Sequence, residues 1–428
     1  MTVIGSNLGD NINGSSNVTL TPKNYNVALI GDSLTAQCSN TSGTENQGYL
    51  TWALRFSGQT LRFKHENNFG VGGYTSAHAK TRVPDVIASG CGVCIVFIGA
   101  NDRGSANMTY TQTATNLTEI RDALIGGGVV PVFVTPPPGG DSVNPLTRTA
   151  QQLSFTYDIR RFIMTELGNE NCHVVDLWPT MAEPTSTIGE IKDGYTHDGL
   201  HWIAEGAIVG GRAIGAVLAT IGRSALNLPT SNSEAWSADY TKGAINPNPT
   251  MQGTSGTVGT GGSGDLATSW ESGNTSAVPN VTRTFSKVTN ARGDWQQVVL
   301  GGTSTQVGGT DIGLQRGFAG TLVAGKSYEV VGEVEWDDDF VNVSSVQLTL
   351  QLSAGGTITA WDGDKYTGAS LIPAAEETSM LLRCSPITVP AGVTDARVRL
   401  SVYTGLDDSD TLVGTIRYRN IVLREVDA

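Results

Sequence analysis

Two short blocks of the sequence carry residue types that together could perform nucleophilic catalysis. Gly31-Asp32-Ser33-Leu34 offers a hydroxyl, and Asp198-Gly199-Leu200-His201 offers a carboxylate three residues before an imidazole. A serine hydroxyl needs a base to become a nucleophile, and the base needs a carboxylate to fix its tautomer. Asp and His at this spacing in one turn can point the same way. We therefore expect Asp198 to hold His201, and His201 to activate Ser33.

Two further blocks could stabilise the negative charge that develops when a nucleophile attacks an ester carbonyl. The block NFGVGG at 68–73 is glycine-rich, so its backbone N–H groups can approach a ligand closely. The block GAND at 99–102 supplies an amide side chain. An oxyanion requires preorganised donors of this kind. The predicted donors are the N–H groups of Ser33 and Gly73 and the side chain of Asn101, with Gly72 as an alternative to Gly73.

The elements that must position these blocks follow an alternating pattern. Short apolar runs that are typical of buried parallel strands occur at 27–30, 93–98, 129–134 and 173–177. Stretches with helical spacing of apolar residues occur at 109–125, 147–167 and 203–221. Strands that alternate with helices predict a doubly wound α/β domain over residues 23–226. Ligands bind at the carboxyl ends of such strands, which is where Ser33 and Asn101 stand.

The rest of the chain is organised differently. Residues 1–22 are polar and are expected to lie outside any core. Residues 227–265 are rich in Pro, Ser, Asn and Gly, which predicts a flexible linker. Beyond it, apolar and polar residues alternate, as in VQLTLQL at 346–352 and SYEVVGEVEW at 327–336. This period of two predicts a C-terminal all-β domain over residues 266–428, a sandwich of jelly-roll type.

Residues 26–222 resemble the SGNH hydrolases of the GDSL esterase family. The four blocks match that family's motifs in order: GDSL around Ser33, NxGxGG around Gly73, GxND around Asn101, and DxxH from Asp198 to His201. The resemblance implies that Ser33 is the nucleophile, His201 the base and Asp198 its partner. It also implies the three oxyanion donors named above, a flavodoxin-like three-layer sandwich, and no metal. The run TPPP at 135–138 resembles a loop found in acetylesterases of the family.

Two tryptophans are expected to contact the substrate. Trp202 follows His201 where family members commonly have proline, which places it beside the acyl or leaving-group side of the ester. Trp361 lies in a loop-like stretch and could offer a flat face to a sugar ring, whereas Trp336 is in phase with the buried side of its strand. The β-sandwich resembles carbohydrate-binding jelly rolls, notably in the final strand GTIRYRNIVLRE.

Composition limits the partners and cofactors. The net charge of −13 over 428 residues argues against nucleic acid, because nothing offsets the repulsion from phosphates. The sequence contains no run of about 18 apolar residues, so we expect no membrane-spanning helix. The N-terminus lacks the features of a secretory signal. We expect no cofactor. The acidic residues Asp337-Asp338-Asp339, Asp362 and Asp364 could ligate a structural Ca²⁺, although acidic loops are more often solvated turns.

Together these patterns favour a serine esterase that removes O-acetyl groups from a polysaccharide, because a tethered sugar-binding domain would raise the local substrate concentration. One alternative is a general short-chain esterase or lipase-like enzyme whose β-sandwich serves only stability or assembly. Another is a non-catalytic adhesin or virion structural protein, although a pure binding module gains nothing from the full catalytic set. An acetylated carbohydrate or small ester is the expected partner. A homo-oligomer and an extracellular or virion-associated location are compatible with the sequence.

Overall fold

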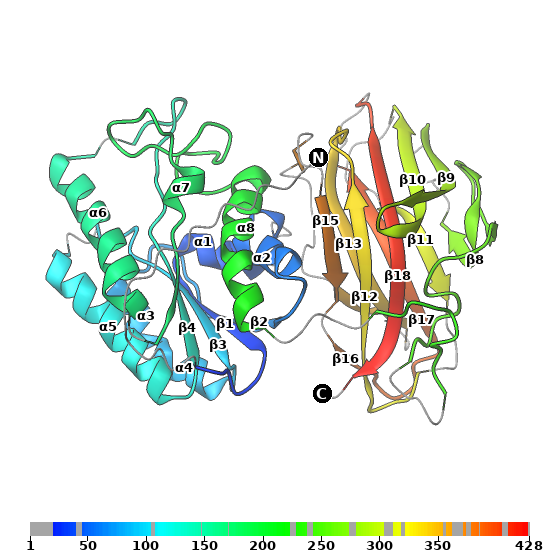
Figure 1. Cartoon of the computed structure of the whole chain (residues 1–428), viewed down its shortest axis with the longest axis horizontal. Coiled ribbons are helices and arrows are strands. Elements are labelled where there is room, and N and C mark those ends of the chain that lie inside the picture. Colours follow the sequence, from blue (N-terminus) through cyan, green and yellow to red (C-terminus); the bar gives the residue numbers. More distant parts are fainter. Residues whose placement is uncertain are drawn as a thin grey trace.

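The computed structural model contains an α/β domain and a β-sandwich that lie side by side (Figure 1). It describes residues 20–39, 45–103, 108–146, 148–169, 171–222, 228–237, 243–273, 280–303, 311–317, 322–353, 357–361, 371–373, 378–384, 386–404 and 410–426. Nearly all of the predicted polar arm at 1–22 falls outside these ranges.

Among the described residues, the α/β domain has a parallel sheet of five strands in the order β2-β1-β3-β4-β5. The strands are β1 (Asn26–Gly31), β2 (Arg62–Asn68), β3 (Val93–Phe97), β4 (Val130–Val134) and β5 (His173–Val175). This order is that of flavodoxin-like folds, and the predicted α/β domain is confirmed. The apolar-run criterion did not find β2, whose sequence RFKHENN is polar because the strand lies at the sheet edge with its middle residues exposed.

Helices cover both faces of this sheet. They are α1 (Ser33–Ala36), α2 (Tyr49–Phe56), α3 (Ser76–Thr81), α4 (Val83–Ala88), α5 (Tyr110–Gly126), α6 (Ala150–Thr165), α7 (Trp178–Met181) and α8 (Ala204–Ile221), with short 3₁₀ turns at Gln37–Ser39, Glu45–Gln47 and Leu167–Asn169. Helices α3 to α6 lie on one face, and α2 and α8 lie on the other, which also faces the β-sandwich (Figure 1). The helical layers explain why β1, β3 and β4 are almost entirely buried.

Helix α8 is long and apolar enough to cross a membrane by length and composition alone. Its apolar character is explained by its packing, because more than half of the helix is buried inside the protein. Gly211 and Gly215 let α2 come close: a Cβ at Gly211 would lie 2.5 Å from Trp52 Cβ, and a Cβ at Gly215 would lie 2.8 Å from Ala53 O. The helix is thus built to pack against α2.

The β-sandwich consists of two sheets in the described part of the chain. One has the order β15-β12-β18-β10-β9-β7, with β16 also on β12, and the other has the order β14-β13-β17-β11-β8-β6. Its strands are β6 (Ser255–Thr257), β7 (Gly262–Gly264), β8 (Leu266–Ser272), β9 (Val281–Asn290), β10 (Gly293–Gly302), β11 (Asp311–Gly317), β12 (Ser327–Trp336), β13 (Val343–Ser353), β14 (Thr357–Trp361), β15 (Thr378–Arg383), β16 (Ile387–Thr388), β17 (Asp395–Thr404) and β18 (Gly414–Val426). The predicted C-terminal β-rich region is confirmed, and the jelly-roll connectivity stays a prediction.

The segment expected to be a flexible linker differs from that expectation. Residues 255–257 and 262–264 form β6 and β7, which pair in parallel with β8 and β9. Further upstream, Ile245 N donates to Leu423 O, and the Asn246 side chain bonds the backbone of Ile421 and Leu423 in β18. A Gly- and Ser-rich composition is compatible with edge strands, and here backbone hydrogen bonds hold it against the sandwich.

The two domains share one hydrophobic core. Trp52 of α2 meets Trp336 of β12 edge to face, with ring centroids 6.5 Å apart, and Trp336 stacks on Phe340. Both tryptophans are fully buried, and buried residues of the sheet, α2, α8 and the sandwich form one continuous cluster. Arg55 of α2 reaches across to donate to Val346 O at 2.9 Å. The β-sandwich is therefore docked on α2 rather than tethered at a distance.

A buried charge cluster also spans the domain boundary. Glu329 of β12 is fully buried and bonds Arg383, whose Nη1 donates to Gln59 O in the α/β domain. Arg62 of β2 lies 3.5 Å from the same carboxylate, and Arg424 of β18 lies 2.9 Å from its other oxygen. Burial alone would raise the pKa of Glu329, but the surrounding arginines, Arg383 first, lower it. Separating the domains would leave this carboxylate with fewer cations.

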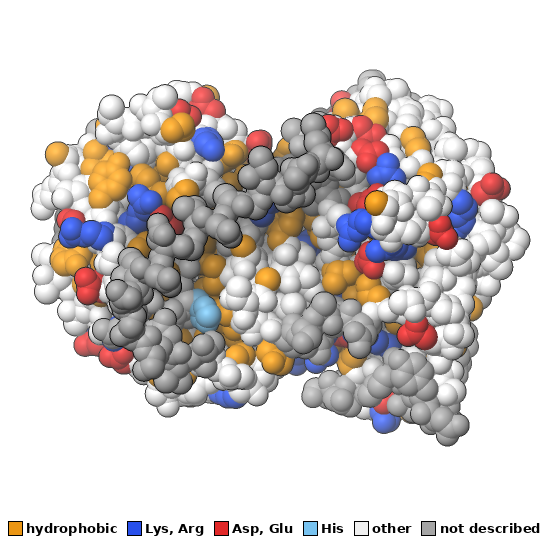
Figure 2. All heavy atoms as spheres, in the orientation of Figure 1, with side chains coloured by type: hydrophobic (Ala, Val, Ile, Leu, Met, Phe, Trp, Pro, Cys, Tyr) orange, Lys and Arg blue, Asp and Glu red, His pale blue; other side chains and the backbone are white. Residues whose placement is uncertain are grey.

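On the face shown in Figure 2, the β-sandwich carries acidic and basic side chains intermixed rather than one sign of charge. Asp337 lies 2.7 Å from two nitrogens of Arg417, and Asp339 accepts from the backbone and hydroxyl of Thr415. These two carboxylates are engaged by protein donors, and a calcium site at this acidic run stays a prediction. Asp362 and Asp364 lie outside the described residues, and there calcium stays a prediction.

Candidate active site

Ser33 stands at the carboxyl end of β1, where the chain turns into α1. Gly31 is required at this turn, because a Cβ would lie 1.9 Å from Thr35 Oγ1 and 2.5 Å from Phe97 O. Asp32 caps α1 by accepting from Leu34 N at 3.1 Å. The turn therefore presents the Ser33 side chain at the rim of the sheet, at the first residue of a helix.

The DGLH block brings an imidazole to this hydroxyl. His201 Nε2 lies 2.9 Å from Ser33 Oγ, and His201 Nδ1 lies 2.6 Å from Asp198 Oδ2. The Asp198 carboxylate can only accept, so Nδ1 carries the proton and Nε2 is free to accept the Ser33 proton. Partial burial alone would raise the pKa of Asp198, but hydrogen bonds from the side chain and backbone of His201 lower it to about 2. The carboxylate thus stays ionised and holds the ring.

A second loop braces the DGLH block, and sequence reasoning missed it. Buried Asp141 accepts from Thr196 Oγ1 at 2.7 Å, and Thr196 Oγ1 in turn accepts from Gly199 N. Gly140 N donates to Gly199 O at 2.6 Å. Gly199 has φ +79°, and a Cβ there would lie 2.4 Å from Asn144 O. The two loops are interlocked, and no sequence motif marks Asp141 or Thr196 for this role.

The glycine-rich block lies beside Ser33, as expected for an oxyanion site. A Cβ at Gly72 would lie 3.9 Å from Ser33 Cβ, and Gly73 adopts φ +78°, which favours glycine. Asn68 anchors the loop, since its Nδ2 donates to Thr35 O and its Oδ1 accepts from Gly70 N. The structure brings Gly72 near Ser33, and the choice of Gly73 over Gly72 as donor stays a prediction.

Asn101 joins the same site from the end of β3. Its Nδ2 donates to Tyr74 O at 3.0 Å, which leaves the second hydrogen of that nitrogen for a ligand. The next residue, Asp102, is fully buried and acts in the scaffold: it accepts from Ser76 N and Thr113 Oγ1, both at 2.8 Å. The GAND block therefore supplies one candidate donor and one brace for α3 and α5.

Asp32 places an unusual carboxyl group directly beneath the nucleophile. It is 4 % exposed, and burial raises its pKa from 3.8 to about 6, against the opposing effects of Leu34 N–H, His201 and Arg103. A buried carboxylate without an ion-pair partner is costly to ionise. Its charge therefore changes in the pH range where an imidazole also titrates.

One predicted substrate contact is wrong, and another lies beyond the described side chains. Trp202 is 1 % exposed and packs in the core against Tyr49, Phe97 and Gly210. The residue after His201 turns inward because α8 begins at Ala204, so the indole fills space under the helix instead of lining the substrate side. Trp361 ends β14, and its side chain is not among those described, so its role stays a prediction.

His197 lies at the rim of the site. Its ring stacks on that of His201 with centroids 5.8 Å apart, and its Nε2 is 3.7 Å from Asp198 Oδ2. In the described part of the chain, His197, Asp198 and His201 form the group that could hold a metal ion. The geometry also explains these residues without an ion, since Asp198 already bonds His201 at 2.6 Å.

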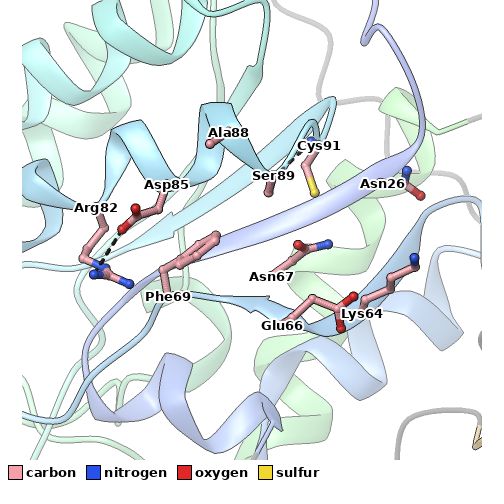
Figure 3. A pocket seen from close by; sticks show the side chains of 10 residues that line it. All are labelled: Asn26, Lys64, Glu66, Asn67, Phe69, Arg82, Asp85, Ala88, Ser89 and Cys91. Atoms are coloured by element: carbon pink, nitrogen blue, oxygen red, sulfur yellow. Dashed lines mark hydrogen bonds and ion pairs between the residues drawn. The ribbon is translucent and has the colours of Figure 1, made fainter.

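Two cavities of different character are lined by residues of, or close to, the four sequence blocks. One of about 600 Å³ lies at the edge of the sheet between β2 and α4, lined by residues of both charge signs such as Lys64, Glu66 and the Arg82–Asp85 ion pair (Figure 3). A smaller one, of about 200 Å³, is lined by Asn101 and Leu200. The second cavity is the one whose lining includes residues of the GAND and DGLH blocks.

Comparisons with known proteins find one family match. Residues 29–207 match the family described as GDSL-like Lipase/Acylhydrolase, so this part of the chain is a GDSL-type hydrolase domain. No curated protein matches the chain.

Several solved structures are similar to this chain. A catalytic mutant of an acetylxylan esterase from Geobacillus stearothermophilus is 17% identical, covering 47% of this chain and 96% of that one, with a TM-score of 0.38. A GDSL-like lipase from Bacteroides thetaiotaomicron VPI-5482 is 15% identical, covering 46% and 88%, with a TM-score of 0.37.

Proposed function

Because residues 29–207 form a hydrolase domain of the GDSL-like lipase and acylhydrolase family, we propose that the chain is a serine esterase that removes O-acetyl groups from a carbohydrate. Ser33 attacks the acetyl carbonyl while His201 Nε2 takes its proton, and the alcohol leaves with that proton. Water activated by His201 then releases acetate from the acyl-enzyme. Ser33 N–H, Gly73 N–H and Asn101 Nδ2 stabilise the tetrahedral oxyanion.

The observation that carries this proposal is the unbroken chain of short contacts from Asp198 through His201 to Ser33. A pKa of about 2 keeps Asp198 ionised and able to hold His201 Nδ1–H. The charge of Asp198 stabilises the imidazolium that forms when His201 takes the proton.

The surroundings of Ser33 favour a small acyl group on a polar alcohol. The cavity lined by Asn101 and Leu200 measures about 200 Å³, below the usual range for sites that enclose a drug-sized ligand, and its lining includes Arg103, Arg148 and Gln152. A long acyl chain would have to lie against these polar groups. An acetyl ester of a sugar fits both the size and the polarity of this space.

The test compares 4-nitrophenyl acetate with the butyrate and octanoate, and then an O-acetylated polysaccharide with soluble acetyl esters. We expect the highest kcat/KM for the acetate and a preference for the polysaccharide. Ser33→Ala should lower kcat by several orders of magnitude, up to about 10⁶ as in a protease triad. The matched control, Ser154→Ala on the exposed face of α6, should leave turnover unchanged. Full activity in Ser33→Ala would sink the mechanism, and a preference for octanoate would sink the acetyl specificity.

A second candidate is a general short-chain esterase whose β-sandwich serves stability. The shared core at Trp52 and Trp336 favours it, because a docked domain contributes to folding whether or not it binds sugar. Equal turnover of acetylated polysaccharide and simple acetyl esters would select this candidate over the first.

A further inference from the structure

The small cavity whose wall includes Asn101 and Leu200 is also lined by two arginines that form no ion pair among the described residues. Arg103 is 9 % exposed and makes one hydrogen bond in the described structure, from Nη1 to Thr156 Oγ1 at 3.0 Å. Arg148 donates from Nη1 to Gly189 O at 3.1 Å, and its Nη2 is buried without a partner. Among the described residues neither guanidinium forms an ion pair, which is unusual because buried charges are normally paired.

The two guanidinium groups converge on one place. A Cβ at Gly139 would lie 2.5 Å from Arg148 Nη2 and 3.5 Å from Arg103 Nη2, so both terminal nitrogens meet at this glycine. Burial first, and the neighbouring charge of Arg148 second, lower the pKa of Arg103 to about 9. Two like charges held together in a partly desolvated site are stabilised when an anion binds between them.

Other lining groups fit the same ligand. Gln152 Oε1 accepts from Thr149 N, so the Gln152 amide nitrogen keeps both hydrogens for a ligand in the described structure. Asp32 interacts electrostatically with Arg103, and Glu190 does so with Arg148. Neither acidic residue forms an ion pair with its arginine among the described residues. The pocket thus presents three side chains with unused donors within a chain of net charge −13.

We propose that this pocket binds an anionic substituent, a carboxylate or phosphate, on the sugar whose acetyl ester is cleaved at Ser33. The inference rests on the proposed esterase function, because it names the class of carbohydrate that the same site takes: an O-acetylated acidic sugar. Asn101, a predicted oxyanion donor, and Leu200, the residue before His201, lie on its wall, so the anion would bind next to the two blocks that carry the reaction. A planar guanidinium fork matches either anion in two-point contact.

Binding is tested on the full chain carrying Ser33→Ala, by titration calorimetry with three glycosides that differ at one carbon. They are methyl glucoside, which is neutral, methyl glucuronide, which has a carboxylate, and methyl glucoside 6-phosphate. We expect an anionic glycoside to bind at least about tenfold more tightly than the neutral one, with weaker binding at high salt. The anionic glycoside that binds more tightly shows whether the pocket takes a carboxylate or a phosphate. The proposal is overturned if neither anion binds more tightly than the neutral glycoside, absence of binding by all three included.

Variants assign the effect to the arginines. Arg148→Gln and Gly139→Ala, whose Cβ would displace Arg148 Nη2, should each remove most of the preference for the anion, and Arg148→Lys should retain part of it. The matched control is Arg161→Gln on α6, an exposed arginine paired with Asp158, which should change nothing. Circular dichroism checks that each variant folds. An undiminished preference in both Arg148→Gln and Gly139→Ala would overturn the assignment.

Kinetics separate this proposal from the esterase proposal. With Ser33 intact, the ratio of kcat/KM for an O-acetylated uronate to its neutral methyl ester should fall about tenfold or more in Arg148→Gln. If no ester of any kind is hydrolysed while the anionic glycosides still bind, the esterase proposal fails and the anion site stands. If neutral acetyl esters are hydrolysed and the charge makes no difference to binding or rate, the anion site fails alone.

Discussion

The docked arrangement of the two domains predicts that they unfold together, and Trp336→Ala tests it. Trp336 is 1 % exposed and packs on Trp52 of α2 across the domain boundary. Replacing a buried tryptophan by alanine costs about 3–5 kcal/mol. In the described structure Trp336 Nε1 has no hydrogen-bond partner, so the loss of that buried donor offsets part of the cost and places the effect near 3 kcal/mol.

The assay combines calorimetry with the temperature at which 4-nitrophenyl acetate turnover is lost. A shared core predicts a single transition in which calorimetric unfolding and loss of activity move down together by several degrees. The control is Trp236→Ala, which is 48 % exposed and should change the free energy of unfolding by no more than about 0.5 kcal/mol. Two separate transitions, with the activity-linked one unmoved in Trp336→Ala, would refute the shared core.

Three further outcomes follow from the site. Asp32→Asn should stabilise the protein by up to about 3 kcal/mol at pH 8 and by little at pH 4. The reason is that the folded-state pKa of Asp32, raised to about 6, makes the stability of the wild-type protein fall as pH rises from about 4 to 6. Equal gains in melting temperature at both pH values would contradict it. Thr196→Val should lower kcat about tenfold by freeing the Gly199 turn from Asp141, whereas Thr220→Val on α8 should not; steady-state kinetics with a melting curve measure both. Asp198→Asn should lower kcat by about 10⁴, because an amide leaves His201 in the wrong tautomer, and a variant within tenfold of wild type would remove Asp198 from the mechanism. The acid limb of the wild-type pH–rate profile should not reflect Asp198, whose pKa is about 2.

The sequence predicted the parts of the molecule whose signals are local. Buried strands such as β3 are continuous apolar runs, and α5 lies within one residue of the helical stretch predicted at 109–125. The four blocks around Ser33, Gly73, Asn101 and His201 were recognisable because each needs particular residue types at short spacing. Edge strands gave no such signal, as β2 and the segment 255–264 show, because their polar and glycine residues resemble those of loops.

Only the tertiary structure decided which distant groups meet. Ser33 and His201 are 168 positions apart, yet their side chains lie 2.9 Å from each other because β1 and the loop before α8 end at the same rim of the sheet. The inward turn of Trp202, the Asp141 brace and the convergence of Arg103 and Arg148 on Gly139 depend likewise on packing between segments. The residue types within a short block can be recognised from neighbouring positions in the sequence. Burial and the pairing of charges depend on how the whole chain folds.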